Sequence, residues 1–444
     1  MMYFSTVGCK SVTRVRFSGC RFQSTVQKQD KILEALSKRG GGDYNPVIFE
    51  QSLRQTSVPA GIAAFPDPLN HDASLANIQL LINKKEIERE VINEKLTAEQ
   101  KELIKLGQWT PPMMTLMKLT LTKHYRHAVS FFKFIKAGIK NVWNTYLSLR
   151  AHVYKGYYVL DNSLTTGDMP SGLAEDRKIA IGNNPKVITD HLSNYFHNVK
   201  AEVSSANVQG STIFSYSGEG VFTRSMYQAV LRTRKDIIKL PMFAVLFGLI
   251  EEGLIPLCYA FPGIAPSSCV LPQLHGRFYG DASKAQKELE ALREAKYGPD
   301  LSRVGSLTPF NMPVDELYLV VRSLRLCYST RIYSEGHLRE LLANRWKQVK
   351  LDNLLILRDG GIWRLSTLET LDACITRGLI DLEQLVRWGK KDDINLYDSI
   401  DCTELHTRLF HFINECEKPG RNAGMLGLST MAKTAQETLA LSDK

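Results

Sequence analysis

The feature that most constrains the fold of this 444-residue chain is one long apolar run at 240–261, with the sequence LPMFAVLFGLIEEGLIPLCYAF. About twenty residues of helix span the hydrocarbon core of a bilayer, so this run is long enough to be embedded in a membrane. Glu251 and Glu252 lie near its centre, and carboxylates at membrane depth normally face a protein interior, a cavity or an ion path. We predict one membrane-embedded segment, either a kinked span or a re-entrant hairpin, with a buried core helix as the alternative.

The first 29 residues have the composition of a mitochondrial targeting segment. They hold five cations and no acid, with hydroxyl and aromatic side chains between them, and the first acid is Asp30. The membrane potential draws such a segment toward the negative matrix. A secretory signal would need an apolar region that this stretch lacks. We predict a mitochondrial transit peptide at 1–29, with a disordered basic tail as the alternative.

A second unusual stretch, between Glu102 and Asp161, contains no acid at all. Lys and Arg are interleaved there with Tyr, Phe and Trp. A helix of this composition can lie on an anionic bilayer with its apolar face down. It can also pack into a core while its cations reach solvent, or bind RNA through phosphates and stacked bases. Membrane contact is the favoured interpretation, core packing the second and RNA binding the third.

From Pro262 onward, apolar residues recur at helical spacing between short polar loops. We predict helices at 280–297, 314–328, 334–343, 348–357 and 366–377, a series typical of an α-helical bundle. Ser366 and Glu369 have the spacing of a capping box, and Gly378 follows Arg377 where a helix should end. The predicted fold class is mainly α, with one membrane-embedded apolar segment followed by an α-helical bundle domain.

These patterns divide the chain into seven predicted parts. They are a transit peptide (1–29), a polar and helical N-terminal region (30–112), a basic aromatic amphipathic helical region (113–160), a polar insertion (161–221), a membrane segment with a basic N-terminal flank (222–270), a helical domain (271–420) and a flexible tail (421–444).

The sequence lacks the motifs of common enzymes and metal sites. It has no P-loop, no G-x-G-x-x-G, no H-E-x-x-H and no G-x-S-x-G. Its eight cysteines form no C-x-x-C pair and lie at no zinc-finger spacing from histidine. We expect no enzyme activity, no metal and no cofactor. The net charge of +10 favours anionic partners such as RNA or lipid headgroups.

Two sets of residues, in this order along the chain, resemble motifs of the LETM family of mitochondrial inner-membrane proteins. The first set resembles the family's membrane segment: Arg232, Thr233, Asp236, Lys239, Pro241, Pro256, Pro262 and Pro266. The second resembles the motif of the family's ribosome-binding-like helical domain: Ser366, Glu369, Ala373, Cys374, Arg377, Gly378 and Trp388. The chain departs from the family in having a long polar insertion and no EF-hand loop, which suggests a divergent, short member.

The resemblance implies a protein that binds mitochondrial ribosomes and supports membrane insertion of their products, cation homeostasis or both. Candidate ribosome contacts are the basic residues Arg339, Arg345, Lys347 and Lys350. The alternative is a component of a potassium/proton exchange system, in which Glu251 and Glu252 would line the ion path because burial raises a carboxyl pKa.

The expected partners are the mitochondrial ribosome and the anionic lipid of the inner membrane, with a homo-oligomer or a LETM-type paralogue as a further partner and no DNA. The expected location is the inner membrane, with the helical domain facing the matrix. The basic flank before the apolar run should also face the matrix by the positive-inside rule. Only a hairpin satisfies both orientations, so the topology stays open between a single crossing and a hairpin.

Overall fold

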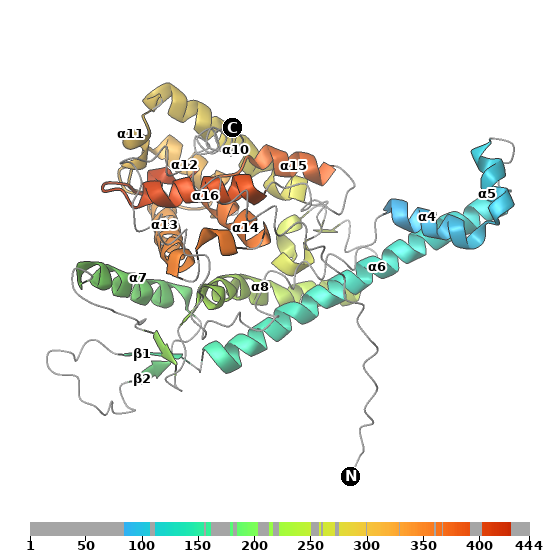
Figure 1. Ribbon diagram of the computed structural model, residues 1–444, viewed down its shortest axis with the longest axis horizontal. Coiled ribbons are helices and arrows are strands. Elements are labelled where there is room, and N and C mark those ends of the chain that lie inside the picture. Colours follow the sequence, from blue (N-terminus) through green and yellow to red (C-terminus); the bar gives the residue numbers. More distant parts are fainter. Residues whose placement is uncertain are drawn as a thin grey trace, which may run out of the picture.

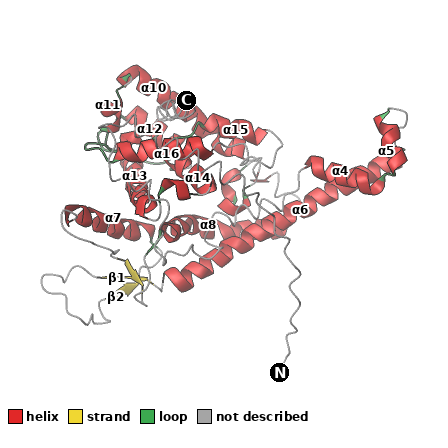
Figure 2. Ribbon diagram, in the orientation of Figure 1, coloured by secondary structure: helices red, strands yellow, loops and turns green. Residues whose placement is uncertain are grey.

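The computed structural model describes residues 84–106, 112–154, 157–160, 178–180, 184–202, 213–215, 222–249, 257–258, 261–270, 275–298, 300–327, 329–358, 361–365, 367–390 and 402–427. Most of them are helical (Figure 2). This confirms the mainly α fold class. The predicted transit peptide lies outside the described residues.

The α-helices run in chain order as follows: α4 (Lys84–Lys95), α5 (Ala98–Lys105), α6 (Met113–Ser148), α7 (Pro185–Glu202), α8 (Arg224–Leu249), α10 (His275–Tyr297), α11 (Leu301–Gly305), α12 (Val314–Ser323), α13 (Glu335–Arg358), α14 (Thr367–Arg377), α15 (Leu382–Lys390) and α16 (Cys402–Cys416). Shorter helical segments are η2 (Leu149–Val153), η5 (Pro262–Ile264), η6 (Ser267–Cys269), η8 (Ile362–Arg364) and η10 (Ala423–Met425). Three strands, β1 (Tyr157–Leu160), β2 (Lys178–Ala180) and β3 (Ile213–Ser215), pair antiparallel in the order β2-β1-β3.

The C-terminal bundle gathers α10 to α16 around one large apolar core (Figure 1). α10 is central, because it packs against both α12 and α15, while α14 packs against α16. Local capping signals set several boundaries. The Asp300 side chain accepts hydrogen bonds from the first turn of α11. Gly378, directly after the last residue of α14, has a φ of 72°, the left-handed conformation of a glycine that ends a helix.

α8 joins this bundle to the long helix α6 (Figure 1). Its first half lies in a core with η2, α7 and α13, where Tyr227 and Val230 are fully buried. Its second half lies in another core with α6 and η6, where Phe243 meets Phe131 and Phe134. Helix α6 continues past the bundle, and α4 and α5 lie beside its projecting end (Figure 1).

The structure corrects the prediction of a membrane-embedded segment. Of the helices that the structure describes, none is both long enough and apolar enough to cross a bilayer. The first half of the apolar run is instead the end of α8, which starts as a basic helix and continues through Pro241 to Leu249. Half of that helix is amphipathic and charged, so its mean polarity is too high for a span.

Three smaller expectations also change. The separate helices expected at 334–343 and 348–357 are one helix, α13, because no helix breaker lies between them. The polar insertion contains helix α7 and strands β2 and β3. Residues 421–427, which we assigned from the sequence to a flexible tail, pack into the bundle, where Leu426 is fully buried.

Candidate functional site

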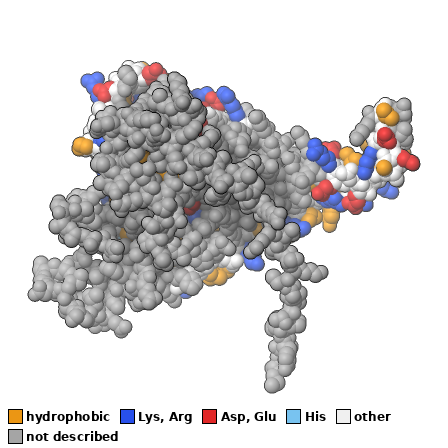
Figure 3. All heavy atoms as spheres, in the orientation of Figure 1, with side chains coloured by type: hydrophobic (Ala, Val, Ile, Leu, Met, Phe, Trp, Pro, Cys, Tyr) orange, Lys and Arg blue, Asp and Glu red, His pale blue; other side chains and the backbone are white. Residues whose placement is uncertain are grey.

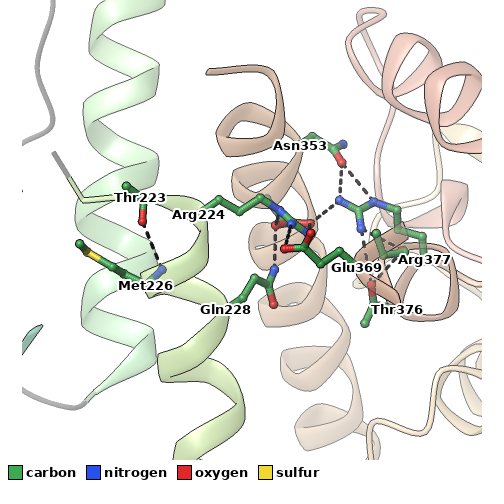
Figure 4. Close-up of polar contacts among 10 residues, drawn as sticks. Thr223, Arg224, Met226, Gln228, Asn353, Glu369, Thr376 and Arg377 are labelled. Atoms are coloured by element: carbon green, nitrogen blue, oxygen red, sulfur yellow. Dashed lines mark hydrogen bonds and ion pairs between the residues drawn. The ribbon is translucent and has the colours of Figure 1, made fainter. Parts of the chain in front are cut away.

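A buried network of charges joins α8, α13 and α14. Asp352 on α13 accepts hydrogen bonds from Arg224 Nε at 2.7 Å, from Arg377 Nη2 at 2.7 Å and from Gln228 Nε2 at 2.7 Å. The Arg224 guanidinium also lies 3.7 Å from the carboxylate of Glu369. Figure 4 shows Arg224 reaching from α8 and Arg377 reaching from α14 toward the same part of α13.

This network holds the helices together and carries no free charge to a ligand. Arg377 is fully buried and also donates to Asn353 Oδ1 at 2.7 Å and to the Ala373 carbonyl at 2.9 Å. Burial alone would raise the pKa of Asp352, but Arg224 and Arg377 outweigh it and hold that pKa at about 2. Each buried charge therefore has an opposite charge beside it, as burial requires.

A second group of cations lies next to this network. Arg232 and Lys235 on α8 and Arg345 on α13 all interact electrostatically with Asp372 on α14. Arg232 and Arg345 are half-buried, and Lys235 reaches solvent. Burial among the surrounding helices lowers the pKa of all three cations. Asp236 also attracts Arg232 and Lys235, and Glu369 also attracts Arg232, so acids of the same bundle lie beside these cations.

Helix α6 carries apolar side chains on two different faces. One face is buried in the protein core and includes Phe131, Phe134 and Val142. The other is exposed, and its large apolar side chains recur at spacings that place them in one row along the helix. That exposed row consists of Met114, Met117, Leu121, Tyr125, Phe132, Trp143 and Leu147. We call it the α6 row.

Cations without an intramolecular partner accompany the α6 row. Lys118, Lys133, Lys136, Lys140 and Arg150 are exposed and form no ion pair with any residue that the structure describes. The helix itself contains no acid. On the projecting arm formed by α4, α5 and α6, cationic, acidic and hydrophobic side chains lie side by side (Figure 3).

The acids of α4 neutralise a different side of α6. Glu88 lies 3.0 Å from Lys123, while Glu90 and Glu94 both pair with Arg126. Because these pairs fasten α4 to α6, Lys123 and Arg126 are used within the protein. The unpaired cations of the preceding paragraph are therefore the ones available to an external anionic surface.

A second exposed apolar row lies on the end of α8. Ile238, Met242, Val245 and Leu249 follow each other at spacings of three and four residues, and Ile238 is 73% exposed. Phe247 on the same helix contacts Phe132 of α6, with ring centroids 5.0 Å apart. The apolar surfaces of the two helices thus lie close to each other.

The two halves of the motif predicted for the membrane segment do meet in the structure. Asp236 on α8 accepts a hydrogen bond from the Ser267 backbone N–H at 2.9 Å and another from the Ser267 hydroxyl. Pro266 precedes η6, and Thr233 is buried one turn from Asp236. The motif therefore encodes the attachment of the η6 turn to α8. Lys239 lies on α8 beyond it, Pro262 opens η5, and Pro256 lies outside the described residues.

Most of the predicted ribosome contacts have intramolecular partners. Arg339 pairs with Glu335 and donates to the Pro309 carbonyl at 2.5 Å. Lys347 lies 3.2 Å from Asp190 of α7, and Lys350 lies over the Trp346 ring. Arg345 alone of the four belongs to the cationic group next to Asp372.

The predicted motif of the helical domain proves to be structural. Ala373 and Cys374 are buried in the bundle, and Glu369 and Arg377 belong to the charge network. A Cβ on Gly378 would lie 2.6 Å from the Gly427 Cα, so this position requires glycine. Trp388 lies on α15. The candidate ion-path residues Glu251 and Glu252, and the predicted helix cap Ser366, lie outside the described residues.

Sequence reasoning missed the residues that anchor the network, Arg224 and Asp352. Charged residues on helices usually mark a solvated face, and the two are far apart in the chain. The signal for Asp352 was its position inside the apolar end of α13, in the sequence VKLDNLLIL, where an acid needs a buried partner.

A family model described as a pentamidine resistance factor domain, PNT1, matches residues 194–359. The chain is similar to that family over this span, which covers less than half of its length and includes all of α8 and α13. No curated protein and no solved structure matches the chain. Proteins of the matching family are associated with mitochondria, which is compatible with a mitochondrial location here.

This match overturns the proposed kinship with the LETM family, because the matching family is a different one and no LETM model matches. The functions drawn from that kinship, ribosome binding with membrane insertion and potassium/proton exchange, were therefore wrong as well. The physical reason lies in the motifs themselves. The first motif encodes the hydrogen bonding of the η6 turn to Asp236 on α8. The second encodes a buried arginine, Arg377, followed by the glycine that ends its helix. Many helical proteins share such features.

Proposed function

We propose that this protein is a peripheral protein of the mitochondrial inner membrane, attached at the matrix surface through the α6 row. The role is one of binding rather than catalysis. The observation that carries the proposal is the pair of apolar faces on α6, one packed in the core and the other exposed among unpaired cations. A helix that is apolar on both sides needs a second apolar environment for its outer face.

The chemistry of the α6 row favours an anionic bilayer. Each large apolar side chain transferred from water contributes about 1–3 kcal/mol. Each Lys or Arg near an anionic surface adds about 1 kcal/mol. The five unpaired cations that accompany the row are Lys118, Lys133, Lys136, Lys140 and Arg150. Helices of this kind lie in the interface plane and do not span it.

The same surface is poorly suited to single-stranded RNA. RNA-binding surfaces of this kind stack bases on aromatic rings. The projecting half of the α6 row begins with Met114, Met117 and Leu121, which are aliphatic and have no face for stacking. Long aliphatic side chains are instead well suited to the acyl boundary of a bilayer.

The inner-membrane location and its matrix side rest on the leader at 1–29, whose acid-free basic composition is that of a transit peptide. The similarity to the pentamidine resistance factor domain is compatible with a mitochondrial location. The partner in this proposal is the anionic lipid of that membrane.

Flotation of the purified chain with lipid vesicles tests the proposal. The wild type should float with vesicles of phosphatidylcholine and cardiolipin, float poorly with phosphatidylcholine alone, and dissociate as salt rises. The double variant Met117→Gln/Leu121→Gln should bind about tenfold more weakly or worse, because two apolar anchors are lost.

The matched control is Phe310→Gln/Ile332→Gln. These residues are exposed to a similar degree, but they lie in the loops that precede α12 and α13 and are not part of α6. This control should float like the wild type. If both double variants bind as the wild type does, or if both lose binding equally, the α6 row is not the attachment surface.

A further inference from the structure

An ion-pair cluster lies between α4 and α6 on the projecting arm (Figure 1). Arg126 on α6 forms ion pairs with Glu94 and, at 3.5 Å, with Glu90, and these two acids lie one turn apart on α4. Lys95 also lies 3.6 Å from Glu94. The hydrogen bond from Arg126 is the main reason why the pKa of Glu94 is lowered. Arg126 is therefore neutralised by carboxylates of a neighbouring helix.

Arg126 belongs to a line of cations along α6. It precedes Lys133 by seven residues, and Lys133 precedes Lys140 by seven residues. Seven residues make about two helical turns, so the three side chains lie on nearly the same side of the helix. Lys133 and Lys140 are exposed, and neither forms an ion pair within the part of the chain that the structure describes. The α4 carboxylates thus neutralise one member of a line whose other two members stay available.

Other contacts also hold α4 on α6. Ile87 and Val91 of α4 are buried, with 0% and 2% of their surface exposed. Glu88 pairs with Lys123 at 3.0 Å, and α4 packs along α6. Apolar burial and the Glu88 pair can therefore keep α4 in place while Arg126 changes its partner.

The ion pairs of Arg126 are weak enough for a membrane surface to compete with them. The side chain of Arg126 is 33% exposed, and those of Glu90 and Glu94 are 51% and 49% exposed. Water and salt screen ion pairs at such positions, so these pairs contribute little to stability. The attraction of one arginine to an anionic bilayer is of the same order. A buried pair, such as that of Arg224 with Asp352, could not exchange in this way.

We propose that Glu90 and Glu94 compete with the bilayer for Arg126 and so set the density of anionic lipid at which the arm attaches. Where anionic lipid is sparse, Arg126 stays paired with α4. Where it is dense, headgroup phosphates replace the two carboxylates, and Arg126 joins Lys133 and Lys140 at the lipid surface. This competition presupposes the proposed attachment through the α6 row, and it gives that attachment a preference for strongly anionic membranes.

Flotation with vesicles of phosphatidylcholine and a stepwise increasing fraction of cardiolipin tests the competition. Glu90→Gln/Glu94→Gln should reach half-maximal binding at a lower cardiolipin fraction than the wild type. At a fixed fraction it should bind about fivefold more tightly, because Arg126 is freed for the headgroups.

The matched control is Glu99→Gln/Glu102→Gln on α5. It removes the same charge from the same arm, but Glu99 and Glu102 are exposed and form no ion pair with any described residue. This control should tighten binding by about twofold or less, since only screened long-range repulsion is lost.

Arg126→Gln separates the proposed exchange from a loosened α4. Alone, it should change binding little, because α4 already neutralises Arg126 in the wild type. Added to Glu90→Gln/Glu94→Gln, it should cancel the gain and return the affinity to about that of the wild type. If the gain came from a loosened α4 that exposes apolar side chains, Arg126→Gln alone would also bind more tightly.

The proposal is overturned if Glu90→Gln/Glu94→Gln gains no more affinity than Glu99→Gln/Glu102→Gln. It is also overturned if the gain persists after Arg126→Gln is added. In either case, wild-type binding that depends on the α6 row leaves the attachment itself intact. If neither the wild type nor any variant floats with cardiolipin vesicles, the attachment and the competition are both wrong.

Discussion

At the scale of single residues, the buried charges near α13 form a closed layer, the network of Arg224, Asp352, Glu369 and Arg377. Asp352 in the closed layer accepts from two arginines and a glutamine, so its neighbours satisfy it completely. The charges on these three helices thus hold α8, α13 and α14 together.

The closed layer predicts how stability depends on acid. The pKa of Asp352 is about 2 in the folded protein and 3.8 in an unfolded chain. Because the folded value is lower, its contribution is fully present above about pH 4 and is lost as pH falls toward about 2. The gap corresponds to about 2 kcal/mol, of which about 1 kcal/mol should be lost by pH 3.

Urea unfolding at pH steps from 7 to 3 measures this loss. Asp352→Asn should be less stable than the wild type at pH 7 and should lack this part of the acid dependence. Glu383→Gln is the control, because Glu383 pairs with Lys287 and Arg387 at a partly exposed surface position where water screens the charges. Equal acid dependence in the wild type and Asp352→Asn would show that Asp352 is not the titrating group.

At the scale of elements, the attachment of α6 to η6 depends on a close approach at Gly138. A Cβ at this position would lie 2.6 Å from the Cys269 sulfur and 3.0 Å from the Ser268 carbonyl oxygen. The Ser268 hydroxyl also donates to the Gly138 carbonyl at 3.1 Å. We predict that Gly138→Val lowers the free energy of unfolding by about 1–3 kcal/mol, because it forces the two segments apart.

The comparison for this prediction is Gly280→Ala in α10. Nothing lies within 4 Å of a Cβ at Gly280, so alanine should stabilise that helix by up to about 1 kcal/mol. Urea unfolding monitored by circular dichroism measures both variants. If Gly138→Val is as stable as the wild type, the tight contact between α6 and η6 does not exist in solution.

Local signals in the sequence were sufficient for several elements of the bundle. Periodicity predicted α10, α12 and α14, and the glycine after Arg377 marked the end of α14. The signals failed where long-range contacts decide. Asp352 and Arg377 are far apart in the chain, and nothing local indicates that Arg377 is fully buried against Asn353. The apolar run misled because Leu240 and Phe243 are buried against protein, where a membrane was expected.

For the candidate surface on α6, too, local composition could be predicted from the sequence, whereas exposure depends on long-range packing. The acid-free composition of α6 predicted a surface helix with apolar and cationic side chains, and the structure adds which side chains are exposed.

At the scale of the whole molecule, one face of α6 packs in the protein core and another is exposed to solvent. Its second half packs on α8 and η6, and its first half projects from the bundle with α4 fastened to it by Glu88, Glu90 and Glu94 (Figure 1). This arrangement presents the α6 row without exposing the bundle core. Attachment through α6 would therefore leave the bundle in water beside the membrane.

Photo-crosslinking to lipid tests this account most directly. The photoreactive residue p-benzoylphenylalanine is placed at Leu121 in the α6 row or at Ile332 on the bundle, which are 68% and 75% exposed. Each protein is irradiated on phosphatidylcholine–cardiolipin vesicles. The account predicts lipid adducts at position 121 and few or none at position 332. Adducts at position 332 alone, or at both positions equally, would contradict attachment through α6.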